Sequence, residues 1–249
     1  DAELLKTSLL SLNVRKRKAG IDRGLRHSMV VSVKNENDDY SETMIGRQEL
    51  FEKRERLRQQ TRILMSQIVL KRNNWERKHP KLQPPAFILK KERELESVWQ
   101  KVRRLDKEIS HQVASETVWF CEQQGVKTIY FEDLRSFQGK GGMRRHSWNL
   151  STNLWGIMIE GVRYRREALG HRKGGIWLVN PAWTSQICHV CGEKGVRVED
   201  ETSTEERKGG EYFHCSECDE HFHADVNAAR NIMHVQQHNK PSAVPGRTA

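Results

Sequence analysis

The hydrophobic pattern of this chain alternates between short apolar runs and long amphipathic stretches. Residues 19–25 and 28–33 are two short apolar runs separated by a few polar residues, which is typical of a β-hairpin. Residues 126–132 and 176–179 are two further apolar runs of strand length. Helical segments separate these runs, so the pattern predicts an α/β protein whose strands come from distant parts of the chain.

Two long segments have helical periodicity. The segment 48–73 carries an apolar stripe among many Arg and Lys residues, formed by Leu50, Leu57, Leu64 and Ile68. The segment 87–124 carries a second stripe, formed by Leu95, Val98, Val102, Leu105 and Ile109. Pro80, Pro84 and Pro85 break the chain between them. We therefore expect an antiparallel helical hairpin at about 48–124, whose charged flanks face solvent by default and a nucleic acid in the alternative.

The rest of the chain predicts two shorter helices and a small module. A helix at about 153–169 has one apolar face, formed by Leu154, Ile157, Met158 and Val162. The predicted domains are a core at 1–182 that includes the hairpin, an inserted module at 183–223, and a final core helix at 224–238. Residues 239–249 have the composition of a disordered tail.

Charge and hydropathy narrow the class of protein. The 249 residues include 43 Lys and Arg against 33 Asp and Glu, which gives a formal net charge of +10. Such an excess favours a polyanionic partner. The expected phosphate contacts are Arg15, Lys16, Arg17, Lys18, Lys140, Arg144 and Arg145; the first four equally suit a solvated strand end. Mean hydropathy is −0.80, and no stretch approaches the ~18 apolar residues that cross a bilayer, which excludes a membrane protein.

The five cysteines divide into two C-x-x-C pairs and one single residue. The paired residues are Cys188, Cys191, Cys215 and Cys218. Two such turns can close a tetrahedron of thiolates around a structural Zn²⁺, although a redox dithiol or two disulfides are competing interpretations. His189 and His214 beside the pairs are expected to face solvent or phosphate, with a ligand role as the alternative. Cys121 is interpreted as a small buried hydrophobe, and this cysteine usage is typical of a reducing cytosol.

Three carboxylates occupy positions that an α/β fold can bring together. Asp22 lies in the first strand, Glu132 ends the run at 126–132, and Asp225 opens the last helix. Taken singly, each suits a surface position, and Asp225 also suits a helix N-cap. Strand ends of an α/β sheet meet at one edge, so the three acids can converge there. Such a cluster repels itself unless cations occupy it, and hard oxygen ligands suit Mg²⁺ or Mn²⁺ in phosphodiester hydrolysis.

Four segments carry a resemblance to a known family. They read GIDRG at 20–24, FEDL at 131–134, NPAWTSQIC at 180–188 and ADVNAARNI at 224–232. From about Ala19 to His234, their order and spacing resemble the RuvC segments and zinc ribbon of TnpB (OrfB) proteins and the related type V CRISPR effector nucleases. The resemblance implies an RNase H-like (RuvC) mixed sheet with flanking helices, a helical hairpin insertion and an inserted zinc ribbon. It also implies that Asp22, Glu132 and Asp225 bind the catalytic Mg²⁺ or Mn²⁺.

The resemblance further implies partners and a lid. Members of the family cut DNA opened by an RNA guide, so guide RNA and target DNA are expected, in a prokaryotic cytoplasm. The loop after Glu132, which contains Gly139, Gly141 and Gly142, falls where the family has a mobile lid. The ribbon falls where the family has a module that helps to load target DNA. The chain begins at Asp1 without the family's guide-gripping and motif-recognising half, which is therefore expected upstream or in a partner.

Two residue patterns depart from the family. Arg23 stands where an apolar residue is usual, and we expect its side chain to face outward. The acidic insertion at 199–211 argues against phosphate contact by that part of the ribbon.

The leading hypothesis is the catalytic half of an RNA-guided DNA endonuclease that hydrolyses guide-opened DNA with two metal ions. The alternative is an RNA-guided DNA-binding effector that does not cut DNA, or that uses the RuvC site to process its guide RNA. A third interpretation, a zinc-ribbon scaffold without catalysis, leaves the ordered trio of acids unexplained.

Overall fold

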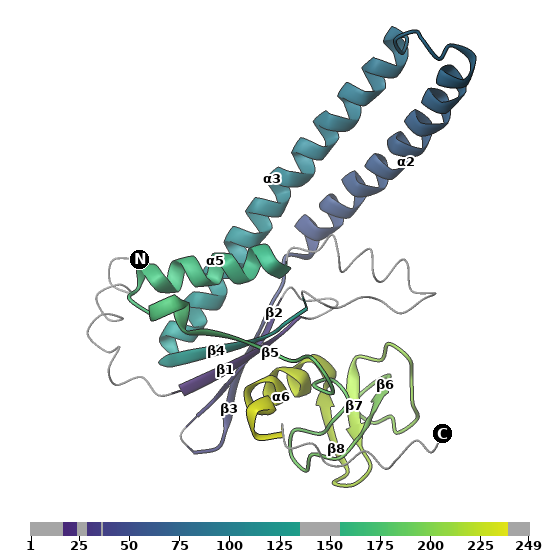
Figure 1. The fold of residues 1–249 in the computed structure, drawn as a ribbon. Coiled ribbons are helices and arrows are strands. Elements are labelled where there is room, and N and C mark those ends of the chain that lie inside the picture. Colours follow the sequence, from purple (N-terminus) through teal and green to yellow (C-terminus); the bar gives the residue numbers. More distant parts are fainter. Residues whose placement is uncertain (1–16, 24–28, 36, 135–154, 239–249) are drawn as a thin grey trace, which may run out of the picture. The chain divides into compact units, whose positions relative to one another are not determined.

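The computed structural model describes residues 17–23, 29–35, 37–134 and 155–238 (Figure 1). The chain divides into two compact units. Residues 47–112 form the smaller unit, and the segments on either side of it form the larger one. None of the helices in the described ranges is long and apolar enough to cross a membrane.

A five-stranded mixed sheet is the centre of the larger unit. Its strands are β1 (Arg17–Asp22), β2 (Met29–Lys34), β3 (Tyr40–Ile45), β4 (Val126–Glu132) and β5 (Ile176–Val179). The order is β3-β2-β1-β4-β5, with β2 antiparallel to its two neighbours and β4 parallel to β1 and β5. The predicted α/β mixed sheet and its hairpin are confirmed. The edge strand β3 is additional, because its polar residues Ser41, Glu42 and Thr43 hide it from a hydrophobic pattern.

Two helices of the larger unit pack on this sheet. Helix α5 (Trp155–Ala168) and a 3-10 turn (Arg172–Gly175) connect β4 to β5, and helix α6 (Ala224–His238) lies against β1 (Figure 1). Met158 and Val162 of α5 are buried as predicted, but Ile157 is 50% exposed. The buried face of α5 is turned toward Ile159 and Arg166 instead.

Arg166 is fully buried although it carries a charge. Its guanidinium donates to Glu122 Oε1 (2.9 Å), to Gly174 O (2.8 Å) and to Val126 O (2.9 Å). His171 Nε2 lies 3.0 Å from the same carboxylate oxygen of Glu122. This network joins the end of α3 to the start of β4 and to α5. Because its charge and donors are satisfied there, Arg166 can lie on the buried face of α5, which the sequence pattern predicts to be apolar.

The smaller unit is the predicted antiparallel hairpin. It contains α2 (Gln48–Lys78) and the first part of α3 (Ala86–Gln123). The buried seam residues are Leu64, Ile68, Val98, Val102, Leu105 and Ile109, whereas Leu50, Leu57 and Leu95 of the predicted stripes are only half-buried. Buried Arg54 pairs with Asp106 across the two helices, so polar contacts supplement the seam near the base of the hairpin.

The cysteine-bearing segment forms its own small sheet. Its antiparallel strands are β6 (Val196–Val198), β7 (Tyr212–Cys215) and β8 (Glu220–His223). Helix α6 begins at the residue after the end of β8. The last strand of the small sheet is therefore directly continuous with the helix that packs on the main sheet. The domain boundaries at 183 and 223 stay a prediction.

Candidate active site

The ends of two adjacent strands bring Asp22 and Glu132 together. β1 and β4 run parallel, with Ile21 opposite Phe131, so the residue after each pair partner lies at the same sheet edge. Asp22 is the last residue of β1, which is the central strand, and Glu132 is the last residue of β4. The sheet therefore delivers two carboxylates to one edge, as the parallel arrangement requires.

The third acid, Asp225, lies on helix α6, which contacts β1 at Gly20. A Cβ on Gly20 would lie 1.9 Å from the carbonyl oxygen of Ala229, so the helix backbone occupies the space of a missing side chain. Asp225 lies one helical turn before Ala229, in the first turn of α6. The glycine at position 20 thus lets the helix approach β1 closely and carry Asp225 toward the end of that strand.

The three acids interact electrostatically in a desolvated environment. Asp22 and Asp225 are each 7% exposed, and Glu132 is half-buried. Burial raises the pKa of the Asp22 carboxyl well above its usual range, and the charges of Glu132 and Asp225 raise it further. Burial also raises the pKa of Glu132. Such mutual repulsion favours a cation at this position, because hard divalent ions neutralise clustered carboxylates.

Three further side chains surround the carboxylates, and the pattern analysis did not identify them as site residues. The Thr184 hydroxyl donates to Glu132 Oε1. Arg197 of β6 lies 3.4 Å from Asp225 Oδ1, measured from its Nη2. Arg23 is only half-exposed and interacts with the charges of Asp22 and Glu132, so the expectation that it faces outward is wrong. No spacing rule predicts these contacts, because each depends on tertiary packing.

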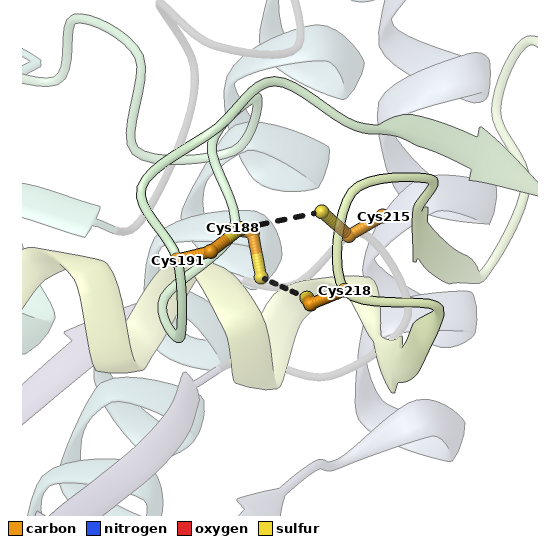
Figure 2. Close-up of side chains that lie close together, drawn as sticks. All are labelled: Cys188, Cys191, Cys215 and Cys218. Atoms are coloured by element: carbon orange, nitrogen blue, oxygen red, sulfur yellow. Dashed lines mark hydrogen bonds between the residues drawn. The ribbon is translucent and has the colours of Figure 1, made fainter.

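The four paired cysteines gather as a metal site would require (Figure 2). Their sulfurs all lie within 4.8 Å of one another, with 3.6 Å from Cys188 to Cys218 and 3.5 Å from Cys191 to Cys215. A tetrahedral Zn²⁺ with Zn–S bonds of about 2.3 Å separates its sulfurs by about 3.8 Å, so the donor set fits zinc. Disulfides do not fit, since an S–S bond is about 2.05 Å long.

Among the described residues, these four thiols are the group of three or more potential metal ligands whose ligand atoms lie within 4.8 Å of one another. The carboxylates of Asp22, Glu132 and Asp225 do not form a group this close among the described residues. Acids that share two ions about 3.5–4 Å apart need not be gathered as closely as the ligands of one ion. Asp22, Glu132 and Asp225 can hold Mg²⁺ or Mn²⁺ by their chemistry, and their catalytic role stays a prediction.

The histidines beside the cysteine pairs do not face solvent, contrary to expectation. His214 is buried, stacks on His221 and contacts Asp219 through Nε2 (3.2 Å). His189 is half-buried, and burial lowers its pKa to about 4. Both rings are therefore parts of the packed ribbon. The expectation for Cys121 is confirmed, because this thiol is fully buried and burial raises its pKa to about 12.

Most of the predicted phosphate contacts lie outside the described residues. These are Arg15, Lys16, Lys140, Arg144 and Arg145, together with the predicted lid glycines Gly139, Gly141 and Gly142. Lys18 is exposed and stays a candidate. Arg17 donates to the carbonyl oxygen of Gln124 at 3.1 Å, at the end of β1 opposite to Asp22. Arg17 therefore has a structural contact of its own.

Comparison with known proteins gives two kinds of relatives by sequence. Residues 162–232 match the family model of the Cas12f1-like TNB domain. A TnpB-like protein of Aquifex aeolicus (strain VF5) is 31% identical over 138 residues, which cover 54% of this chain and 42% of that protein. A CRISPR-associated endodeoxyribonuclease Cas12f1 of Sulfoacidibacillus thermotolerans is 26% identical over 140 residues, covering 55% and 29%. The chain thus spans less than half the length of these curated relatives.

Solved structures show the same fold. A Cas12f1–sgRNA–target DNA complex matches with a TM-score of 0.57 and 22% identity, over 88% of this chain and 50% of that one. A CRISPR-Cas12f ternary complex matches with a TM-score of 0.59 and 24% identity, over 86% and 38%. The fold, the ordered sequence segments and the cysteine cluster agree. The sequence and the fold make this chain similar to TnpB-like and type V CRISPR effector proteins, with a RuvC-type mixed sheet and a cysteine cluster that fits a zinc ribbon.

Proposed function

We propose that this chain is the catalytic part of an RNA-guided DNA endonuclease, in which Asp22, Glu132 and Asp225 bind two divalent metal ions. The observation that carries the proposal is the desolvated cluster of three acids at the ends of β1, β4 and the start of α6. The name endodeoxyribonuclease of the Cas12f1 relative supports the reaction, and the guide and target in the Cas12f1 complex support the partners.

The residues of the chain have separate tasks in this proposal. Asp22 interacts with both other acids, so it would hold the ions together with each of them. The Thr184 hydroxyl occupies one oxygen of Glu132 and leaves the other free for a ligand role. Arg197 balances the charge of Asp225. When bound, the ions supply an activated water and stabilise the leaving oxygen of the phosphodiester.

The helical hairpin supports a nucleic-acid partner. It has a hollow of about 580 Å³, lined by Lys53, Arg56, Leu57, Gln60, Lys101, Arg104, Leu105 and Glu108. Four of these residues are cations and one is an acid, so the charge of the hollow suits a phosphodiester backbone. We include this face in the proposal as a surface for guide or target.

The decisive experiment is Asp22→Ala in a complete guide-bearing complex with Mg²⁺. We expect cleavage of labelled target DNA to be abolished, because a ligand of both ions is lost. Target binding in a gel-shift assay should stay unchanged or become slightly tighter, since a charge that repels phosphate is removed. Ca²⁺ should mimic the variant in the native complex, because the larger ion accepts looser oxygen geometry.

The other functions are distinguished by the same assay. A native complex that leaves guide-opened DNA intact in Mg²⁺ contradicts DNA cleavage. Trimming of a guide precursor that depends on Asp22 would then move the site to RNA processing. If neither nucleic acid is cut, the binding-only alternative holds.

A further inference from the structure

A short segment joins the candidate active site to the cysteine cluster. Residues 184–189, called the strap here, begin with Thr184 and include Cys188. The Thr184 hydroxyl contacts the Glu132 carboxylate, and Cys188 is one of the four clustered thiols. Thr184 and Cys188 are only four residues apart, so the segment between the two sites is short.

Two buried asparagines of α6 hold the strap along its length. Asn231 Nδ2 donates to Thr184 O (2.9 Å) and to Ile187 O (2.7 Å). Asn227 Nδ2 donates to Ile187 O (2.8 Å), and its Oδ1 accepts from the backbone N–H of His189 (3.0 Å). Asn227 and Asn231 are 0% and 1% exposed. They lie one turn apart on the helix that carries Asp225, so one helix face fixes the strap.

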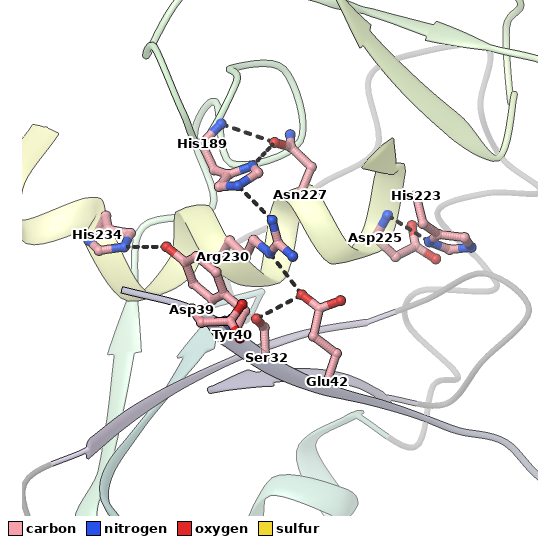
Figure 3. A network of polar contacts seen from close by, with 10 residues as sticks. All are labelled: Ser32, Asp39, Tyr40, Glu42, His189, His223, Asp225, Asn227, Arg230 and His234. Carbon is pink, nitrogen blue, oxygen red and sulfur yellow. Dashed lines mark hydrogen bonds and ion pairs between the residues drawn. The ribbon is translucent and has the colours of Figure 1, made fainter. Parts of the chain in front are cut away.

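The end of the strap is anchored to the main sheet as well (Figure 3). Arg230 Nη1 lies 2.7 Å from His189 Nε2, and its Nε donates to Glu42 Oε1 of β3 (2.8 Å). Arginine only donates, so His189 Nε2 accepts and the ring proton is assigned to Nδ1, which faces Asn227 Oδ1 at 3.0 Å. The guanidinium also covers the ring of Tyr40, 4.3 Å from its centroid.

These contacts hold the strap by hydrogen bonds to its backbone at Thr184, Ile187 and His189. The Asn231 side chain faces two backbone carbonyl oxygens, which can only accept hydrogen bonds. Its amide nitrogen, and not its amide oxygen, must therefore point toward them. Displacing the strap would leave two buried carbonyls and a buried amide without partners, a costly arrangement in a protein interior. The position of the Thr184 hydroxyl on Glu132 is therefore set by α6 on one side and by the cysteine cluster on the other.

We propose that Asn231 is a positioning residue that, through the strap, couples the zinc-binding cluster to the divalent-metal affinity of the three acids. The inference rests on the proposed function, since it assumes that the acids bind Mg²⁺ or Mn²⁺. Asn231 touches neither metal site. It acts on Glu132 through Thr184, in the way that outer hydrogen bonds orient metal ligands elsewhere.

The test measures Mn²⁺ affinity of the full 249-residue chain without nucleic acid, from the electron paramagnetic resonance signal of free Mn²⁺. Thr184→Val keeps the shape of the side chain and removes the hydroxyl, and Asn231→Asp keeps the shape and removes both donors. We expect each to weaken Mn²⁺ binding by about 10-fold or more, as the loss of outer-shell partners does. Thr184→Ser restores the hydroxyl and should bind like the native chain.

Four comparisons separate positioning from general damage. Thr184→Val should retain zinc by elemental analysis, and the exposed strap variant Gln186→Ala should leave both metals unaffected. The double variant Thr184→Val/Asn231→Asp should be no weaker than Thr184→Val alone, because both changes act through one contact. Cys215→Ser removes a zinc ligand that lies outside the strap, and we expect the same loss of Mn²⁺ affinity.

The outcomes distinguish this inference from the proposed function. If the native chain does not bind Mn²⁺, or binds it equally after Asp22→Asn, the proposed metal site and the inference fall together. If Asp22→Asn abolishes binding while Thr184→Val or Cys215→Ser leaves it unchanged, the coupling alone is overturned.

Discussion

At the scale of single residues, Arg166 and Glu122 form an ion pair that is fully enclosed by the protein, with no exposed surface on either side chain. We expect Arg166→Met to lower the free energy of unfolding by about 3–5 kcal/mol, because the Glu122 carboxylate is left buried without its main partner. Urea denaturation followed by circular dichroism measures this change.

An exposed ion pair on the same helix provides the control. Arg163 and Glu160 are 2.7 Å apart with side chains 32% and 64% exposed. Arg163→Met should cost less than about 1 kcal/mol, since solvent screens the pair. The double variant Arg166→Met/Glu122→Met should regain much of the loss. Equal effects of the two single arginine variants would contradict the view that burial gives the Arg166 network its importance.

The acids and cysteines of the site were predictable from the sequence, whereas their neighbours were not. The C-x-x-C pairs leave a local signal, whereas the three acids stand out only together, by their positions in the predicted α/β order. Thr184 and Arg197 leave none, because their contacts with the acids arise only when ribbon, sheet and helix pack together. Arg23 follows Asp22 directly, but its half-buried position beside Glu132 comes from packing. Asn227 and Asn231 did leave a signal, since two amides one turn apart interrupt an otherwise apolar helix face.

At the scale of elements, the approach of α6 to β1 depends on the absence of a side chain at position 20. Gly20→Ala would place a Cβ 1.9 Å from Ala229 O and 2.8 Å from Met233 Cγ. Because a helix backbone cannot yield as a side chain does, we expect a loss of at least about 1–3 kcal/mol in unfolding free energy. Thermal and urea denaturation both report it.

Gly156 is the matched control, because it is a helical glycine of α5 with nothing within 4 Å of a built Cβ. Gly156→Ala should stabilise the protein by about 0.4–1 kcal/mol through the reduced freedom of the unfolded chain. If the two substitutions change stability in the same direction, the close approach at Gly20 does not hold α6 in place.

The element bounds show where a hydrophobic pattern succeeds. Strands β4 and β5 and helix α6 have the predicted bounds, because glycine, proline or the cysteine module marks their ends. Helix α2 continues past Asn73 to Lys78, since its polar last turn carries no apolar periodicity. Strand β3 was not predicted for the same reason. Helix α5 exposes Ile157 because Arg166 lies on its buried face, and hydrophobicity scales do not predict a buried arginine.

At the scale of the whole molecule, the cysteine cluster should stabilise one part of the chain more than the rest. Cys215→Ser is expected to remove zinc and to speed amide hydrogen exchange in β6, β7 and β8, because a closed metal site supplies much of the folding energy of so small a sheet. The five-stranded sheet has its own buried core, so its amides should stay protected. Hydrogen–deuterium exchange with mass spectrometry resolves the two regions.

Metal content provides the control for this prediction. Native protein should contain about one zinc ion per chain, as four thiolate ligands require. Unchanged exchange in the ribbon after zinc loss, or a disulfide between the two cysteine pairs in purified protein, would show that the cluster is not a structural zinc site.

The contact between Gly20 and Ala229 also has a consequence for the order of events during synthesis. Its two partners are separated by roughly two hundred residues, and at about 5–20 residues per second a ribosome needs about 10–40 s to make that length. Until then β1 lacks the contact with α6, and the nascent chain carries two of the three carboxylates. The cluster of three acids that we propose as the metal site is therefore complete only after α6 has been synthesised and has packed on β1.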